Sequence, residues 1–295
     1  MQPYTGFASV YDIFMDNVPY DEWTDYVTHL FKQFNLKEGL VLELGCGTGS
    51  MTRRLASKGY DMIGIDYSED MLSIARDQNI DEDQSILYLC QDMREFELFG
   101  TVAAVVSVCD SMNYIVSEEE LLKVFRLVNN YLDPEGLFIF DLDTPYAYER
   151  ILGDTTIAEN REEGSFIWEN TYYKEEMINE INLTLFLPEM DDIDEEETED
   201  RKDCRSVTEK SQKDKNCDQE ENDYTQDEGD LIYRKYEENH FRRAYPIETI
   251  KRLIEEAGME WVAAYDAFTE ESPKIDSERI YIIAREKHQT EKLYV

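Results

Sequence analysis

The chain has 295 residues, 42% of them hydrophobic, which is enough for a buried core in one large domain or two small ones. Asp and Glu (67) outnumber Lys and Arg (29), so the formal net charge at pH 7 is -38. Such an acidic chain repels phosphate backbones and anionic membrane surfaces, and we therefore expect neither nucleic acid nor a membrane as partner.

The first half of the chain alternates short apolar runs with stretches of helical periodicity. The apolar runs are GLVLEL, YDMIGID, SILYLC, VAAVVSVC and GLFIFDL, and helices are indicated at TGSMTRRLASKG, SEDMLSIAR and SEEELLKVFRLVNNYL. Nearly continuous apolar strands that alternate with helices are typical of a parallel sheet covered on both faces. The sequence therefore predicts an α/β fold.

The pattern changes near Thr144. SFIWENTYYKEEMINEINLTLFLP alternates polar with apolar residues, which indicates antiparallel strands with one solvated face, and LIYRKYEENHFRRAY resumes this alternation further on. We expect these segments to pair with each other. PIETIKRLIEEAGM then predicts a helix, and MEWVAAYDAF and RIYIIARE predict two final strands.

The same change of pattern divides the chain. Residues 1–145 and 244–295 are expected to form the α/β domain, and residues 146–188 and 230–243 an inserted β-sheet lid. Residues 189–229 are dominated by charged and amide side chains, which bury too little surface to offset the entropy of ordering. We expect this acidic segment to be a disordered loop.

The N-terminal segment, the longest apolar run and the cysteines all indicate a protein of a reducing compartment. MQPYTGFASVYD lacks the basic and apolar regions of a signal peptide, and TVAAVVSVC is too short to cross a bilayer. The five cysteines are odd in number and scattered, which fits neither a disulfide framework nor a metal site. We expect a cytoplasmic protein without a bound metal.

A glycine turn directly follows the first strand. Gly45, Gly47 and Gly49 let the backbone turn sharply and leave bare peptide groups for a ligand, and Asp66 ends the second strand where a carboxylate reaches ribose hydroxyls. The spacing is G-x-G-x-G rather than the G-x-G-x-x-G of dinucleotide sites, and Glu43 precedes it. An acid beside the turn suits a cationic amino-acid group better than a diphosphate. We therefore expect a ligand in which an adenosine carries a cationic amino-acid group.

These residues carry a resemblance to a known family. ELGCGTG, from Glu43 to Gly49, resembles the first motif of class I S-adenosylmethionine-dependent methyltransferases, and Asp66 and the segment QDM at 91–93 resemble the family's ribose-binding and adenine-binding positions. The resemblance implies the family's Rossmann-like seven-stranded sheet and S-adenosylmethionine as cofactor. It implies cofactor contacts from Tyr11, Glu43, Gly45, Cys46, Gly47, Asp66, Tyr67, Asp92, Met93 and Cys109.

A finer resemblance is to the small-molecule members, the ubiquinone/menaquinone-biosynthesis-like and sugar N-methyltransferase-like branches. Residues 4–12 are similar to their Y-x-x-F-A-x-x-Y-D segment, and these members also carry an antiparallel lid. The resemblance implies methyl transfer to a nitrogen or oxygen of a small soluble acceptor. We expect acceptor contacts from Tyr4, Asn113, Tyr114 and His240, with Tyr11, Asn113 and His240 converging on one cavity, and His240 is the one candidate base.

Two other functions stay open on the sequence alone. A regulatory protein would bind the cofactor without turnover and use its acidic loop to recruit a basic partner. A methyltransferase acting on protein or RNA is the other alternative. Asp141 and Asp143 form a D-x-D pattern that is found in some metal sites, but no partner acids lie nearby in the sequence, and a structural role is expected.

The acidic loop generates a first prediction. Deleting residues 191–228 should leave the melting temperature and the cofactor affinity nearly unchanged, because the segment has little apolar surface to bury and closing a long loop costs only about 0.6 kcal/mol per doubling of its length. Thermal unfolding and calorimetric titration of the deletion variant check this. A large fall in melting temperature would mean that the segment packs on the body of the protein.

Overall fold

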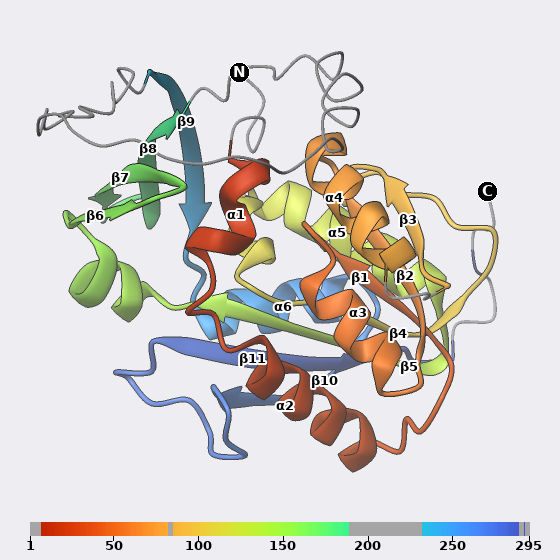
Figure 1. The fold of residues 1–295 in the computed structure, drawn as a ribbon. Helices are drawn as coiled ribbons and strands as arrows, with labels where there is room; N and C mark the ends of the chain where they lie inside the picture. The colour runs from red at the N-terminus through yellow and green to blue at the C-terminus, as the bar shows by residue number, and fades with distance from the viewer. Residues whose placement is uncertain (1–6, 82–84, 189–231, 289–291, 293–295) are drawn as a thin grey trace, which may run out of the picture.

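The computed structural model describes residues 7–81, 85–188, 232–288 and 292. Tyr4 and the acidic segment 189–229, for which we expected an acceptor contact and a disordered loop, lie outside the described residues. The described part forms an α/β body with a smaller β-sheet beside it (Figure 1).

The body is built on one seven-stranded sheet in the order β10-β11-β5-β4-β1-β2-β3. The first five strands along the chain are parallel, and β11 inserts antiparallel between β5 and β10. The chain order reverses between β1 and β4, which is where a doubly wound sheet opens a ligand crevice. The strands are β1 Leu40–Leu44, β2 Asp61–Asp66, β3 Leu87–Cys90, β4 Val102–Ser107, β5 Leu132–Asp143, β10 Glu260–Asp266 and β11 Arg279–Arg285.

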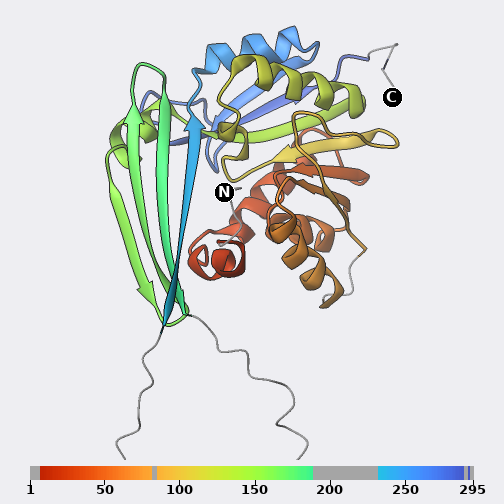
Figure 2. The ribbon, with the colours of Figure 1, turned by 90° about the horizontal axis from the view of Figure 1, so that it is seen from above.

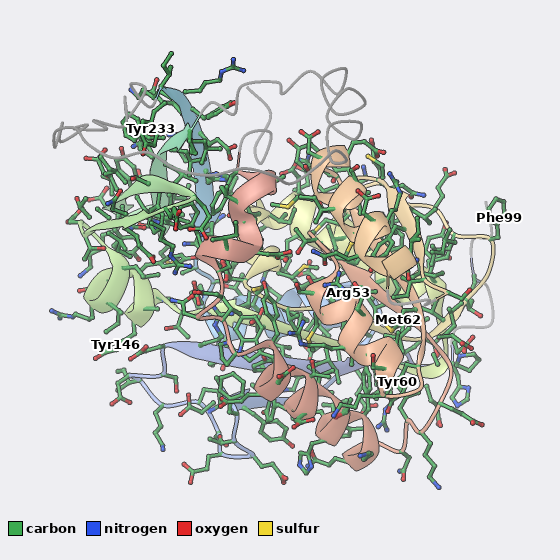
Figure 3. The ribbon with its side chains drawn as sticks, viewed as in Figure 1. Arg53, Tyr60, Met62, Phe99, Tyr146 and Tyr233 are labelled. Carbon is green, nitrogen blue, oxygen red and sulfur yellow. The ribbon has the colours of Figure 1, made fainter. Side chains whose placement is uncertain are left out.

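Helices cover both faces of this sheet, because alternate strand residues face opposite sides. On one face α5 and α6 pack on side chains such as Leu42 and Val105; on the other, α2, α3 and α4 pack on side chains such as Val41 and Ala104. Figure 3 labels Arg53 of α3 and Met62 of β2 on this second side. The helices are α1 Ala8–Phe14, α2 Tyr20–Gln33, α3 Ser50–Ser57, α4 Glu69–Asp81, α5 Glu118–Tyr131 and α6 Ile247–Glu256.

The insertion between β5 and α6 forms a separate antiparallel sheet in the order β6-β7-β8-β9. Its strands are β6 Thr156–Arg161, β7 Gly164–Tyr173, β8 Ile178–Pro188 and β9 Tyr233–Arg243, and a π-helical turn, η2 Ala147–Leu152, leads into it. We call this sheet the lid. The seven-stranded sheet with helices on both faces and an inserted antiparallel sheet is the architecture that the sequence predicted.

The short helix α1 lies between the lid and the body (Figure 2). Phe7, Val10 and Phe14 pack against lid side chains, whereas Asp12 accepts hydrogen bonds from Thr48 Oγ1 at 2.7 Å and Gln78 Nε2 at 3.1 Å. The helix is therefore apolar toward the lid and polar toward the body. Within the described part of the chain, no helix is both long and apolar enough to cross a membrane.

Candidate active site

One cavity of about 410 Å³ opens at the carboxyl ends of β1 and β4, beneath α1 and the lid. Its lining falls into two halves. The glycine turn and the ends of β2 and β3 form the first, with Glu43, Gly45, Cys46, Gly47, Asp66, Tyr67, Asp92 and Met93. The second comes from α1, α2, the β4–η1 connection and the lid, with Phe7, Tyr11, Tyr20, Asp110, Tyr114, Trp168, His240 and Arg242.

The glycine turn needs glycine for both conformation and space. Gly45, Gly47 and Gly49 all have positive φ angles, of 75°, 53° and 75°. A Cβ on Gly45 would come within 2.7 Å of Ser111 Oγ in η1 (Ser111–Tyr114). The backbone N–H groups of Gly45 and Cys46 both donate to Ile65 O, at 2.8 and 3.0 Å, which ties the turn to the end of β2. The turn therefore brings bare backbone to the floor of the cavity.

Asp66 connects the end of β2 to this turn. Its Oδ2 accepts from Gly47 N and its Oδ1 from Ser68 N, both at 2.8 Å. Ser68 Oγ accepts from Met71 N at 3.3 Å, so Ser68 caps α4. Burial raises the pKa of Asp66. The carboxylate is thus fixed on the cavity wall by two backbone donors.

Glu43 is the acid on the first strand. Its side chain is buried, lines the cavity and accepts a hydrogen bond from Thr52 Oγ1 at 2.5 Å. Burial raises the pKa of Glu43 to about 8, and the nearby carboxylate of Asp66 adds to the effect. At neutral pH the buried surroundings of Glu43 therefore favour the protonated acid, and a cationic ligand group would favour the ionised form.

Asp92 is already paired in the structure. Arg94 Nε donates to both of its carboxylate oxygens, at 2.9 and 3.0 Å, and this pairing lowers the pKa of Asp92. Arg94 also reaches Glu120 Oε1 at 3.0 Å and lines the cavity. A ligand that hydrogen-bonds to Asp92 would share its carboxylate with Arg94. Arg94 was not among the site residues expected from the sequence.

The strand β9 presents a row of ionisable side chains to the cavity side. Glu238, His240 and Arg242 are buried at alternate positions, and their neighbours Glu237, Asn239 and Phe241 are exposed. His240 Nε2 lies 3.2 Å from Glu238 Oε2, and Glu238 Oε1 accepts from the backbone N–H of Phe7 at 3.3 Å. Strand alternation thus turns His240 inward, and Glu238 links it to the start of α1.

A buried group of charges lies where β4, β5, β9 and β11 meet; we call it the ion cluster and define it as Asp110, Asp141, Asp143, Arg242 and Arg279. Arg279 reaches the carboxylates of Asp141 at 2.6 Å and of Asp110 and Asp143 at 3.0 Å each. Arg242 Nη1 donates to Asp110 Oδ2.

Asp141 also holds a strained segment of backbone. Cys109 and Asp110 have φ angles of 64° and 53°, which non-glycine residues rarely adopt. Their N–H groups donate to Asp141 at 3.2 and 2.9 Å. The two acids of the D-x-D pattern therefore have the structural role that the sequence suggested, since they bind arginines and backbone in the described structure.

Tyr11, Asn113 and His240 were expected to converge on one cavity, and two of the three do so. Tyr11 and His240 line the cavity, as do Tyr114 and Cys109. Asn113 does not: its Nδ2 donates to Asp143 O at 3.2 Å and Arg243 O at 2.8 Å, and its Oδ1 accepts from Asp143 N at 3.0 Å. The amide of Asn113 is consumed in joining η1 to β5 and β9, so its expected acceptor contact is wrong.

Comparison with known proteins places this site in context. Residues 41–136 match the family model of the methyltransferase domain. The protein YqeM of Bacillus subtilis, named as a methyltransferase, is 30% identical over 283 residues and covers 96% of each chain. A Streptomyces venezuelae enzyme, dTDP-3-amino-3,4,6-trideoxy-alpha-D-glucopyranose N,N-dimethyltransferase, is 30% identical over 136 residues, or 45% of this chain and 56% of that enzyme. The crystal structure of an S-adenosylmethionine-dependent methyltransferase from Clostridium acetobutylicum shares the fold with a TM-score of 0.73 at 23% identity, over 97% of this chain and 99% of that one.

The buried acid on β1 generates a prediction on stability. The folded state raises the pKa of Glu43 from 4.5 to about 8, so the stabilisation from its neutral form is complete below pH 4.5 and is lost as pH rises through 8. Glu43→Gln keeps the oxygen that accepts from Thr52 and cannot ionise. Between pH 5 and pH 8.5 the unfolding free energy of the variant should therefore fall less than that of the wild type, by a few kcal/mol at most, when both are measured without ligand.

Urea unfolding at several pH values measures this difference. Glu260→Gln, at an exposed position on β10, is the matched control and should follow the wild type. Parallel pH dependence in the wild type and in Glu43→Gln would contradict the assignment.

Proposed function

The chain belongs to the class I S-adenosylmethionine-dependent methyltransferases, and we propose that it transfers the methyl group to a nitrogen or oxygen atom of a small soluble acceptor. The observation that carries this proposal is the single cavity that joins the glycine turn to an aromatic chamber beneath the lid. The free thiols of Cys46, Cys90 and Cys109 support a cytoplasmic location as part of the same proposal.

The residues of the first half of the cavity fit the cofactor. The glycine turn leaves backbone uncovered, and Asp66 is fixed beside it to receive ribose hydroxyls. The carboxylate of Asp66 lies close enough to Glu43 to help raise the pKa of Glu43. Glu43 can therefore ionise when a cationic group approaches. We assign the adenosine to the side of Asp66, Tyr67 and Met93, and the amino-acid group to the side of Glu43.

The mechanism we propose is an in-line displacement that depends mainly on positioning. S-adenosylmethionine, when bound, supplies an activated methyl group on a sulfonium with a good leaving group. Tyr11 and Tyr114 lie on the opposite half of the cavity, where aromatic faces stabilise positive charge. The helix α1, held to the body through Asp12 and packed on the lid through Phe14, covers the cavity against water.

An amine or hydroxyl acceptor must release one proton as the new bond forms. His240 is our candidate for receiving that proton, since it lines the cavity and stands edge-on to Tyr114 with ring centroids 6.0 Å apart. Glu238, with its Oε2 3.2 Å from Nε2, would stabilise the resulting imidazolium. The Streptomyces venezuelae relative methylates the amino group of a nucleotide-linked sugar, which supports a small acceptor with a proton to lose.

The alternatives find less support. A cofactor-binding regulator needs no chamber beside the cofactor, yet the lid and α1 enclose one with buried polar groups. A cavity of about 410 Å³ lined by α1 and the lid suits a small acceptor better than a polymeric one. The acidic net charge of -38 argues further against RNA.

A transfer experiment tests the proposal. The protein is incubated with S-adenosylmethionine carrying a labelled methyl group and a small-molecule extract of bacterial cells, and the label should appear in a low-molecular-mass product.

Asp66→Asn should weaken cofactor binding by about 1–3 kcal/mol, because the variant lacks the charged acceptor of two backbone N–H groups and of the ribose hydroxyls. Tyr11→Ala should lower turnover more than it lowers stability.

Asp61→Asn, an exposed change at the start of the same strand, should leave cofactor binding unaltered. Label in protein or RNA, or no transfer despite tight cofactor binding, would overturn the small-acceptor proposal.

A further inference from the structure

Among the described residues of the acceptor half, Arg242 is the arginine that lines the cavity, and its hydrogen-bonding capacity is only partly used. The residue is 7% exposed, lines the cavity and belongs to the ion cluster. Its Nη1 donates to Asp110 Oδ2 and lies 3.9 Å from Asp143 Oδ2. The guanidinium is therefore anchored at one end, which fixes the direction in which its other donors point.

The opposite edge of this guanidinium has no partner among the described residues. Nε is buried without a hydrogen-bond partner, and the polar contacts of Arg242 with the described part of the chain run through Nη1. The Nε–H and one Nη2–H of an arginine point the same way and form a fork that binds oxygen atoms. A buried donor without a partner costs stability, so an oxygen atom bound at this edge would relieve that cost.

Aromatic side chains surround the guanidinium of Arg242. The guanidinium carbon lies 5.9 Å from the ring centroid of Tyr114, 5.9 Å from that of Tyr148 and 5.8 Å from that of Trp168. Tyr114 and Trp168 also line the cavity. A ligand at the fork would therefore lie against flat apolar faces, which favours a group that is small and uncharged.

The charges nearby select against an anion. The ion cluster contains three carboxyl groups and two guanidinium groups, so it carries one net negative charge when all are ionised and none when one carboxyl is protonated. In neither state does the ion cluster carry the net positive charge that would attract an anionic ligand. Glu238, two positions along β9 from His240, adds a further acid to the same face.

We propose that Arg242 forms the acceptor subsite and that its Nε/Nη2 edge hydrogen-bonds an uncharged oxygen of the acceptor, such as a carbonyl or hydroxyl, rather than a carboxylate or phosphate. This inference rests on the proposed function and adds to it the chemistry of the group that the acceptor presents to the lid. Arg242 is a positioning and specificity residue in this account, because its fork holds the acceptor and takes no part in the bond that forms.

The test uses two probes of nearly the same shape that differ in charge, benzamide and benzoate. Each is titrated by NMR into the full-length protein saturated with S-adenosylhomocysteine, so that no methyl transfer occurs. Benzamide should bind more tightly than benzoate, and Arg242→Lys, which keeps the charge but lacks the fork, should weaken benzamide binding about tenfold. Arg243→Lys, a neighbour that does not line the cavity, is the matched control and should bind benzamide like the wild type.

The cofactor product is titrated into every variant first, so that a failure of the proposed function, seen as no binding of S-adenosylhomocysteine, is separated from a failure of the subsite. If Arg242→Lys does not fold, the double variant Asp110→Asn/Arg242→Gln removes one charge of each sign and should show the same loss of benzamide binding. Tighter binding of benzoate, or benzamide binding that is unchanged in the Arg242 variants, would overturn the inference.

Discussion

The ion cluster is the interaction on which the geometry of the acceptor half depends, because it ties the lid to the seven-stranded sheet through buried charges. Arg279 of β11 and Asp141 of β5 come from the sheet, Asp110 comes from the strained connection between β4 and η1, and Arg242 comes from the lid. Removing one partner from a buried charge group costs about 3–5 kcal/mol, since it leaves an uncompensated charge. The cluster therefore fixes the position of β9, and β9 places His240 and Arg242 at the cavity.

The two halves of the cavity are built in different ways. The cofactor half is local: the turn after β1 and the ends of β2 and β3 meet because parallel strands end at one edge of a sheet. The acceptor half is assembled from distant segments. The packing of Phe7 and Phe14 on the lid, the hydrogen bonds of Asn113 and the ion cluster bring α1, η1 and β9 together. This division separates the residues that would hold the methyl donor from those that would select an acceptor.

The same division explains what the sequence predicts. The sheet, the lid and the cofactor half follow from strand periodicity, from the glycine spacing and from Asp66, all of which are local signals. The helix α2 was missed although Trp23, Val27, Leu30 and Phe31 carry the apolar periodicity of a helix. Arg242 and Asp110 could not be paired from the sequence, because they lie 132 positions apart and no local pattern indicates a contact.

The central claim is that the cofactor lies on the glycine turn with its reactive end toward α1 and β9. A crystal structure of the protein with S-adenosylhomocysteine tests it most directly. The account predicts ribose hydroxyls hydrogen-bonded to Asp66 and a sulfur atom that faces the space between Tyr11, Tyr114 and His240. A ribose bound away from Asp66, or a sulfur that points away from the lid, would contradict it.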